Sequence, residues 1–579
     1  MRLIIFIILF FASSAWAADI GCGKDTDQNG SVDAWCTGIF NCTDQDGDGY
    51  CTNGLGPNTG TDCNDQDFFD YPDPAAGTDS GCSSGQAKAC QSDGTYTACQ
   101  NFCPSDCLQC YYIDTASGND ANAGTWAAPW KTSAMFSDSD SHPSGWHTRA
   151  AGDCFVYKNS AVFADTITYT IGGGPRTYGF ALDGAVGADG NSTNPIRVLG
   201  IPGKWPTYTP SGSSKQFGTL AGGQDYTKVS GFKITSANCS GGISNSVCLA
   251  SESSSNNKLY NLVAKDNLGS DNTAGLMLHS STDSEAHHFF ILNHTQDGGN
   301  DDNTAAFLGY RGQNNSVHDF VLIQPNASTE TFKVKHSDYS SEWDVKRFIS
   351  SGGSMQFASR QTTIMNGLML DSGIQFNNPG GTSYTGDETL QYLTFKNADG
   401  FILSIAGYLD YDIDGSGSSD RCSSDYTIAN ISLSDSIAQD SDASYPNKDD
   451  RFMFVGLYDS DPMFAETVDA LSFPDNVFYN PNTTLSWAIF EAANATETCG
   501  GYGILGGSYS FAQLSSSLTI DTTGSAVEDP SFDALNTADC ASCAGKGWNA
   551  NWGTASGGGG GSTSSRKGQL RSSGRKGQK

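Results

Sequence analysis

The chain has 579 residues, and its 31 Lys and Arg against 63 Asp and Glu give a formal net charge of −32 at pH 7. This acidic excess argues against nucleic acid as a partner, because phosphate groups would be repelled. The length exceeds that of a typical single domain and the composition changes along the chain, so we expect several domains.

Residues 1–17 have the features of a secretory signal. One charged residue, Arg2, precedes an apolar run from Leu3 to Phe11, and residues 15–17 form a small-x-small end. The run is too short to span a bilayer, and no other stretch reaches about 18 apolar residues. We therefore expect a mature chain without a transmembrane segment, a monomer that is secreted or attached to the cell surface.

Residues 18–110 form a segment rich in Cys and Asp. Of the 18 Cys in the chain, 11 lie between Cys22 and Cys110, and residues 19–110 hold 15 Asp, two Lys, no Glu and no Arg. Few large aliphatic residues occur here, so apolar burial cannot hold the segment compact. We expect disulfides and bound cations to replace a core, since export takes the thiols into an oxidising compartment.

Spacing alone does not fix the pairing of these cysteines, but some pairs are favoured. Cys154 is expected to take the odd thiol of the N-terminal set. Three later pairs are expected: Cys239 with Cys248, Cys422 with Cys499, and Cys540 with Cys543.

Cys103, Cys107 and Cys110 have the spacing of a zinc knuckle. No His stands near them in the sequence, and the compartment oxidises thiols. Disulfides are therefore favoured over zinc at this turn.

Asp-rich turns predict calcium sites. Asp44-x-Asp46-x-Asp48-Gly49 alternates carboxylates before a Gly, with the Tyr50 carbonyl next in line, as in the first half of an EF-hand loop. The spacing recurs in residues 25–30 and 410–415. All three turns lack the closing Glu and flanking helices, so we do not expect a true EF-hand.

Residues 44–50, followed by residues 62–72, resemble the Asp-rich, Cys-rich metal-binding repeats of bacterial surface proteins, which are similar to thrombospondin type 3 repeats. The resemblance implies that neighbouring turns share Ca²⁺ without helices. The alternatives are a soluble acidic linker at the N-terminus and a solvated turn at residues 410–415. The candidate calcium ligands are Asp25, Asp27, Asn29, Asp44, Asp46, Asp48, Tyr50, Asp62, Asp65, Asp67, Asp410, Asp412 and Asp414.

Residues 111–132 and 151–157 carry a second resemblance. The first stretch contains a Gly-Asn-Asp turn and Pro129-Trp-Lys-Thr132, and the second opens with Gly152-Asp153 before an apolar strand. Together they resemble the first coil of right-handed parallel β-helix proteins of the pectate-lyase-like superfamily. In that superfamily a capping helix lies between the two stretches, but residues 133–149 are too rich in Ser and Asp to predict one. The resemblance spans residues 111–548 and implies an all-β, right-handed parallel β-helix behind the calcium-binding, disulfide-rich module.

A repeated phrase supports this fold. The phrase is a six-residue pattern: positions 1, 4 and 6 are apolar, position 3 is usually a turn former, and positions 2 and 5 hold any residue. It occurs nine times, and successive copies start 20 to 40 residues apart. Each copy suits a short strand with one buried face, and polar turn formers fill the gaps. We expect Phe232, Leu262, Phe289 and Phe320 to lie above one another; a β-sandwich or a propeller is the alternative. The copies start at Val229, Leu259, Ala286, Val317, Val345, Met365, Leu390, Ile428 and Val468.

Acidic polysaccharide is the substrate that the resemblance suggests. Calcium-dependent lyases of this superfamily neutralise the uronate carboxylate with an ion and remove a proton with Lys or Arg. Lys333 and Lys335 share one strand face, and one coil separates Arg311, Lys335 and Arg360. Lys333 or Lys335 is the candidate base and Arg360 the candidate partner of the leaving oxygen; solvated strand residues are the alternative.

His279, His287, His288 and His294 form a second cluster, which we expect on strand and turn surfaces. Motifs of β-helix polygalacturonases, Gly-His-Gly and Arg-x-Lys with paired Asp, are absent from the sequence, so hydrolysis of that type is disfavoured. Four aromatic residues are candidates for stacking on sugar rings: Trp343, Tyr408, Tyr411 and Trp487.

Two functions remain open from the sequence. One is a secreted, calcium-binding lyase of an acidic polysaccharide, and the other is a non-enzymatic surface or adhesive protein that binds glycans. Residues 549–579 are a Gly- and Ser-rich basic tail, with six Lys and Arg and no acid in residues 566–579, for which we expect disorder.

Overall fold

The computed structural model describes residues 77–78, 81–82, 86–91, 95–164, 167–171, 174–210, 215–235, 247–269, 273–296, 304–324, 330–335, 341–359, 361–379, 388–396, 401–408, 431–439, 451–457, 471–479, 488–492, 507–509, 521–527, 529–530, 538 and 540–548. Strands dominate these residues, and their only helical element is a 3₁₀ turn, Ser133–Met135. No helix among them is long and apolar enough to cross a membrane.

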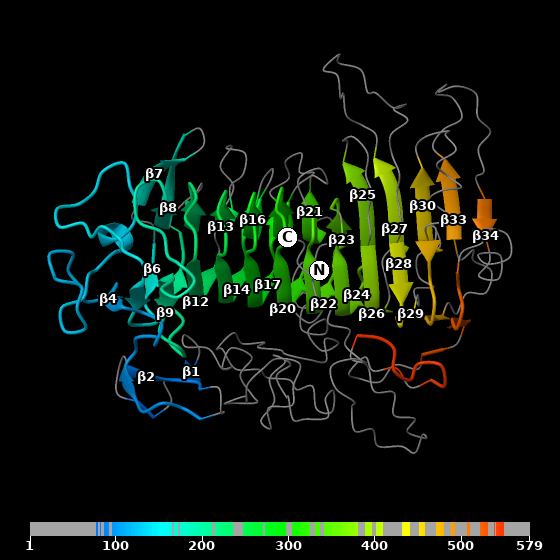
Figure 1. Cartoon of the computed structure of the whole chain (residues 1–579), viewed down its shortest axis with the longest axis horizontal. Helices are drawn as coiled ribbons and strands as arrows, with labels where there is room; N and C mark the ends of the chain where they lie inside the picture. The colour runs from blue at the N-terminus through cyan, green and yellow to red at the C-terminus, as the bar shows by residue number, and fades with distance from the viewer. Residues whose placement is uncertain are drawn as a thin grey trace, which may run out of the picture.

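Two long sheets run side by side along the molecule (Figure 1). In their central part each coil gives one strand to the first sheet and the next strand to the second. Four consecutive coils are β13 (Val247–Glu252) with β14 (Lys258–Lys265), β16 (Ala274–His279) with β17 (Glu285–Leu292), β19 (Ala305–Tyr310) with β20 (Ser316–Ile323), and β21 (Glu330–Lys335) with β22 (Asp344–Ser351). Every strand of these coils pairs in parallel with its equivalent in the next coil. The expected all-β parallel β-helix is confirmed.

The remaining strands of both sheets pair in parallel, except the two end strands of the first sheet, which pair antiparallel with their neighbours. The first sheet, with 13 strands in the described residues, also contains β7 (Ile167–Ile171), β8 (Gly174–Asp183), β11 (Lys215–Ala221), β23 (Met355–Phe357), β25 (Ile374–Pro379), β27 (Phe401–Tyr408), β30 (Arg451–Leu457), β33 (Ala488–Ala492) and β34 (Gly507–Tyr509). The second, with 17 strands in the described residues, also contains β4 (Gln109–Ile113), β5 (Asp153–Tyr157), β6 (Val162–Phe163), β9 (Ile196–Gly200), β10 (Thr207–Tyr208), β12 (Thr227–Thr235), β24 (Thr363–Leu370), β26 (Glu388–Lys396), β28 (Ile431–Ser434), β29 (Ile437–Gln439), β31 (Leu471–Ser472), β32 (Val477–Tyr479) and β35 (Ala526–Val527).

The long strands of the second sheet bend at one residue each. The ladder pairs Tyr260 with His287 and Leu262 with Phe289, and it leaves out the residues between them. These skipped residues have positive φ, which turns the strand and divides the sheet into two faces. This bend column consists of Gly231, Asn261, His288, Asp319, Arg347, Asn366 and Tyr392.

Apolar side chains stack inside the coils. The register places Phe232, Leu262, Phe289 and Phe320 above one another, as expected. The Phe320 ring lies 5.1 Å from that of Phe289 and 5.3 Å from that of Phe348, nearly parallel to both. The alternation in each copy of the phrase therefore produces a continuous core of aligned side chains.

The register corrects one of the predicted repeat starts. Val345 pairs with Ile364, so the sixth copy begins one residue before Met365. Ile364 and Met365 are both apolar, and the phrase fits either of them. Leu390 pairs with Leu433, whereas the predicted eighth and ninth starts, Ile428 and Val468, lie outside the described residues.

The first coil explains the motif that carried the resemblance. Asp120 of the Gly-Asn-Asp turn accepts hydrogen bonds from the backbone N–H groups of Lys131 and Thr132, each at 2.8 Å. Asp153 accepts one from the N–H of Ala150 at 2.7 Å and starts β5, which pairs in parallel with β4. Between these strands a single 3₁₀ turn stands where the superfamily has a capping helix.

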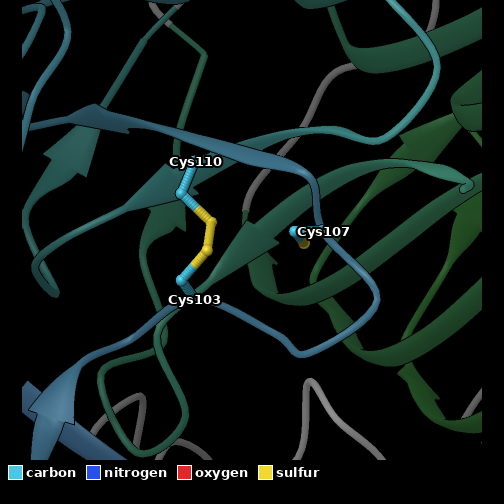
Figure 2. A group of neighbouring side chains, drawn as sticks. All are labelled: Cys103, Cys107 and Cys110. Carbon is cyan, nitrogen blue, oxygen red and sulfur yellow. A yellow bond between two sulfur atoms is a disulfide. The ribbon is translucent and has the colours of Figure 1, made fainter.

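Disulfides tie the N-terminal module to this first coil. The small sheet of β1 (Gly77–Thr78), β2 (Gln86–Ala89) and β3 (Gln100–Asn101) leads to the turn that holds Cys103 and Cys110, which are bonded to each other (Figure 2). Cys107 of the same turn is bonded to Cys154, as expected. The three knuckle sulfurs are thus consumed in disulfides, which leaves no thiolate for zinc.

Two further disulfides are described. Cys540 is bonded to Cys543 as expected, and Cys82 is bonded to Cys99. The other two expected pairs include residues outside the described part of the chain. These residues are Cys239, Cys422 and Cys499.

The C-terminal segment, residues 540–548, folds back onto the middle of the stack. The N–H of Trp548 donates to Thr394 Oγ1 at 3.1 Å, and Asn366 Nδ2 donates to the carbonyl of Trp548 at 3.2 Å. Cys543 packs with Ile437 on the same side. The segment therefore bridges strands that lie more than 100 residues away in the sequence.

The fold gives a prediction for the aromatic stack. Phe320→Ala leaves a cavity between the rings of Phe289 and Phe348, and we expect a loss of about 3–5 kcal/mol in unfolding free energy, measured by urea titration. Val162→Ala is the control, because Val162 is 66% exposed and its loss should change stability by less than about 0.5 kcal/mol. Equal losses for the two variants would contradict the stacked core.

The disulfides give a second prediction. Cys107 and Cys154 close a loop of 47 residues, whereas Cys540 and Cys543 are only 3 residues apart. Replacing both members of the first pair with Ser should cost about 4 kcal/mol, against about 2 kcal/mol for the second pair, since the longer loop constrains the unfolded chain more. Urea unfolding without reductant measures both losses, and the reverse order would refute the assignment.

Candidate functional site

The outer face of the first sheet carries a line of polar side chains across the four central coils. Glu252 on β13 pairs in register with His279 on β16, His279 with Tyr310 on β19, and Tyr310 with Lys335 on β21. Successive members lie roughly 4.8 Å apart along the stack, because they occupy equivalent positions in neighbouring coils. All four are partly exposed at the C-terminal ends of their strands. We call these four residues the outer column.

His279 is a neutral imidazole in the middle of the outer column. Burial, together with the nearby charge of Arg311, lowers the pKa of His279 below its usual value. The Tyr310 ring meets the imidazole edge-on, with ring centroids 4.9 Å apart. His279 Nδ1 has no hydrogen-bond partner within the described part of the chain. Nδ1 is buried, so the nitrogen of the neutral ring that a ligand can reach is Nε2, and it can accept a proton near pH 7.

Glu252 has the opposite tendency. Burial raises the pKa of its carboxyl group, and the charge of Arg176 offsets only part of that effect. A raised pKa means that the carboxyl group holds its proton to higher pH than an ordinary Glu, which favours a proton donor, whereas its register neighbour His279 can accept a proton. Two adjacent groups whose environments move their pKa values in opposite directions are a recurring feature of acid–base sites.

Cations stand at the other end of the outer column. Lys335 is its last member, and the N–H of Arg311 donates to the carbonyl of Lys335 at 3.3 Å. The Arg311 guanidinium lies 5.3 Å from the centroid of the Tyr310 ring, and its side chain is exposed. One-coil spacing thus brings Arg311 beside Lys335, where both can meet an anionic group of a ligand.

The other sequence-predicted catalytic residues lie elsewhere. Lys333 is buried, and its Nζ donates to Glu330 Oε1 at 3.0 Å. Its register neighbour on β19, Leu308, is buried with Met277 in an apolar cluster on the same outer face. Arg360 lies outside the described residues.

Two members of the outer column carry no signal in the local sequence. Glu252 and Tyr310 belong to no motif, and only the register shows that they stand next to His279 and Lys335. The separations along the chain, 27, 31 and 25 residues, match the repeat of the phrase and are the signal that could have found them.

The predicted surface position of the histidine cluster was wrong for three of its four members. His287, His288 and His294 are buried, although we expected them on strand and turn surfaces. Burial lowers the pKa of His294 to about 4. His287 and His288 are buried because they join a set of charged side chains on the second sheet. Strand alternation predicts on which face of the sheet a side chain lies, but it does not predict whether other residues cover that face.

Most of the aromatic candidates and all of the calcium-ligand candidates are either buried or outside the described residues. Trp343 is buried in the core, so it does not stack on a ligand. Tyr411 and Trp487 lie outside the described residues, as do all 13 candidate calcium ligands, the signal segment and the basic tail. Within the described part of the chain, the one cluster with metal-ligand spacing is the disulfide-bonded turn of Cys103, Cys107 and Cys110.

Among known proteins, similarity to this chain is found in solved structures. No protein-family profile and no curated protein matches the chain. A rhamnogalacturonan lyase is similar with a TM-score of 0.36 and 13% identity, over 69% of this chain and 90% of that one. A pectate lyase has a TM-score of 0.33 and 14% identity, over 69% and 82%. A lacto-N-biosidase from Eubacterium ramulus has a TM-score of 0.34 and 10% identity, over 66% and 67%.

At such low identities and TM-scores, none of these likenesses carries an argument about activity. The fold is established by the parallel pairing of the chain's own coils and by the contacts of Asp120 and Asp153 in the first coil. The chain is therefore a parallel β-helix protein of the kind that its leading segment predicted.

Proposed function

We propose that the outer column is the active site of a lyase that cleaves an acidic polysaccharide by β-elimination. The order of its residues along the stack supports this proposal. In a uronate the leaving oxygen, the carbon that loses a proton and the carboxylate follow one another along the sugar. The outer column presents a proton donor, a proton acceptor and cations in the same order: Glu252, His279, and then Arg311 with Lys335.

The elimination balances with these groups. His279 takes the proton from C5, and the electron pair of that bond forms the C4–C5 double bond. The C4–O bond breaks, and the leaving oxygen takes the proton of Glu252. Arg311 and Lys335 neutralise the carboxylate at C6, which makes the C5 proton more acidic, and their charges stabilise the negative charge that develops there.

Tyr310 holds the two halves of the site together. Its ring packs near both the His279 imidazole and the Arg311 guanidinium. The ring therefore orients both the base and the cation that faces the carboxylate.

The sequence-based assignment of Lys333 or Lys335 as base and Arg360 as leaving-group partner stays a prediction beside this one. Lys333 donates to Glu330, so its ammonium proton is already engaged with a carboxylate. Secretion and calcium binding by residues 18–110 also remain part of the proposal, and they are motivated by the leader and the Asp-rich turns. Non-enzymatic glycan binding is the competing function.

Variant kinetics test the assignment of the base. His279→Ala should lower kcat on the cleaved uronate about 100- to 10,000-fold, because the group that removes the proton is lost. Lys333→Ala is the matched control, since it removes a basic side chain from the same face and should leave kcat unchanged. Pectate, alginate and related uronates are supplied with calcium, and the absorbance of unsaturated ends is followed. A large loss for Lys333→Ala with activity kept in His279→Ala would reverse the assignment.

The pH profile gives a separate check. Because the pKa of His279 is lowered, the imidazole stays neutral below the usual range of histidine. Activity should therefore persist at mildly acidic pH and fall only as the pH drops through that lowered pKa. If no uronate is cleaved while glycan binding survives His279→Ala, the non-enzymatic function is favoured instead.

Calcium removal tests the N-terminal module. Chelation should make residues 19–110 sensitive to protease while the coils stay resistant, because the order of an Asp-rich segment without a core depends on bound ions. Mass spectrometry of the digestion products measures both regions. Equal resistance of residues 19–110 with and without chelator would count against the calcium assignment.

A further inference from the structure

The four coils that carry the outer column also carry a chain of charged side chains on the second sheet. β14 follows β13, β17 follows β16, β20 follows β19, and β22 follows β21 (Figure 1). Each member of the outer column thus lies at the end of a strand, and the next strand along the chain belongs to this second array. We call this array the ionic brace.

Every junction between these coils is bridged by at least one ion pair of the brace. Lys258 on β14 contacts Glu285 on β17. Glu285 Oε1 lies 2.7 Å from His318 Nε2 on β20. Asp319, the residue after His318, accepts two hydrogen bonds from Arg347 on β22, each at 2.6 Å.

His318 is the central link. Its Nδ1 lies 2.6 Å from Asp319 Oδ2, and its Nε2 faces Glu285, so a carboxylate stands at each ring nitrogen. A protonated ring donates to both carboxylates. A neutral ring can donate to only one of them, and when Nδ1 is unprotonated it can accept from Arg347 Nη2, which lies 3.2 Å away. The charge of the ring, and with it the strength of the link between β17 and β20, therefore depends on one proton.

Part of the ionic brace lies in the bend column. In the bend column, Gly231, Asn261 and Asn366 are residue types that tolerate positive φ. At the three coils between Asn261 and Asn366 the bend residues are His288, Asp319 and Arg347, with φ of 49°, 52° and 51°. Asp tolerates positive φ as Asn does, whereas for Arg347 the conformation costs about 1–2 kcal/mol, which its two hydrogen bonds to Asp319 help to offset.

We propose that His318 is a positioning residue, whose imidazolium locks the four central coils in register and so holds the outer column in its working geometry. This inference rests on the proposed function for its consequence in activity. Its structural part, a proton-dependent link between the coils, stands on the contacts of the brace alone. Nothing in it requires His318 to touch a substrate.

The groups that face His318 define the direction of the effect. β14 contributes Lys258 and Tyr260, β17 contributes Glu285, His287 and His288, and β22 contributes Asp344, Lys346 and Arg347. The His287 ring stacks on that of His318 at 5.1 Å, and burial lowers the pKa of His287 to about 3, so it adds no charge near pH 7. The two carboxylates are therefore the groups that stabilise the imidazolium.

The signs of the pKa shifts follow from these contacts. Burial alone would lower the pKa of His318, but the charge of Asp319 and the hydrogen bonds of Asp319 and Glu285 raise it above its usual value. A raised pKa gives stability that is fully present below the ordinary range of histidine and is lost as the pH rises through the raised value. Asp319 and Glu285 have lowered pKa values, so their contribution is lost only in acid.

Amide hydrogen exchange of the full chain tests the brace directly. Protection in β17, β20 and β22, corrected for intrinsic exchange, is measured from about pH 6 to about pH 10. In the wild type, protection should fall as the pH rises, about tenfold for each unit that separates the pKa of His318 in the closed and open states. In His318→Gln the protection should be lower at pH 6 and independent of pH.

Two further variants keep the test decisive. Glu285→Gln removes one of the two carboxylates that hold the imidazolium, so the fall in protection should move to lower pH even if His318→Gln does not fold. His142→Gln is the control, because His142 is exposed, stacks on Trp146 and lies outside the brace, and it should behave as the wild type. Flat protection in the wild type, or an unchanged midpoint in Glu285→Gln, would overturn the brace.

Activity separates this proposal from the one on which it rests. The alkaline limb of kcat/KM should move to lower pH in Glu285→Gln together with the exchange midpoint. If exchange responds while every uronate is left uncleaved, the link between the coils stands and the proposed function fails. If cleavage occurs with an alkaline limb that Glu285→Gln does not move, His318 does not position the outer column and the inference is refuted.

Discussion

Parallel backbone pairing between one coil and the next is the constraint on which the rest of this molecule depends. It places equivalent residues of neighbouring coils roughly 4.8 Å apart, so any side chain type that recurs at one position becomes a line along the stack. Phe289, Phe320 and Phe348 form such a line inside. Glu252 and His279 belong to another outside. Core and candidate site are thus two products of the same register.

The two faces of the coil use this register for different chemistry. On the first sheet, neighbouring positions of the outer column hold a carboxyl group with a raised pKa and an imidazole with a lowered pKa, a combination that suits proton transfer. On the second sheet, neighbouring positions of the brace hold opposite charges, which suits cohesion between coils. Buried ion pairs seldom add much net stability, but they specify one arrangement over others. Specifying a register is what an extended site on a stack of coils requires.

Much of the fold could be predicted from the sequence, because strand alternation and coil length are local properties. Phe232 and Leu262 stack as expected, and Asp120 confirms the leading motif. The site was harder to predict, since a line such as Glu252 to Lys335 exists only once the register is known. One ambiguous step, Ile364 against Met365, assigns the residues of that coil to the wrong faces, and the covering of an outward face has no local signal.

The return of the C-terminal segment has a consequence for how the stack comes apart. A solenoid of nearest-neighbour coils would open from its free end, one coil at a time. Here the carbonyl of Trp548 is bound by Asn366, and its N–H is bound to Thr394, so the late coils lie inside a clasp fastened to the middle of the molecule. Unfolding from that end has to break these contacts of Trp548 first, so the late coils and the middle coils unfold as one cooperative unit.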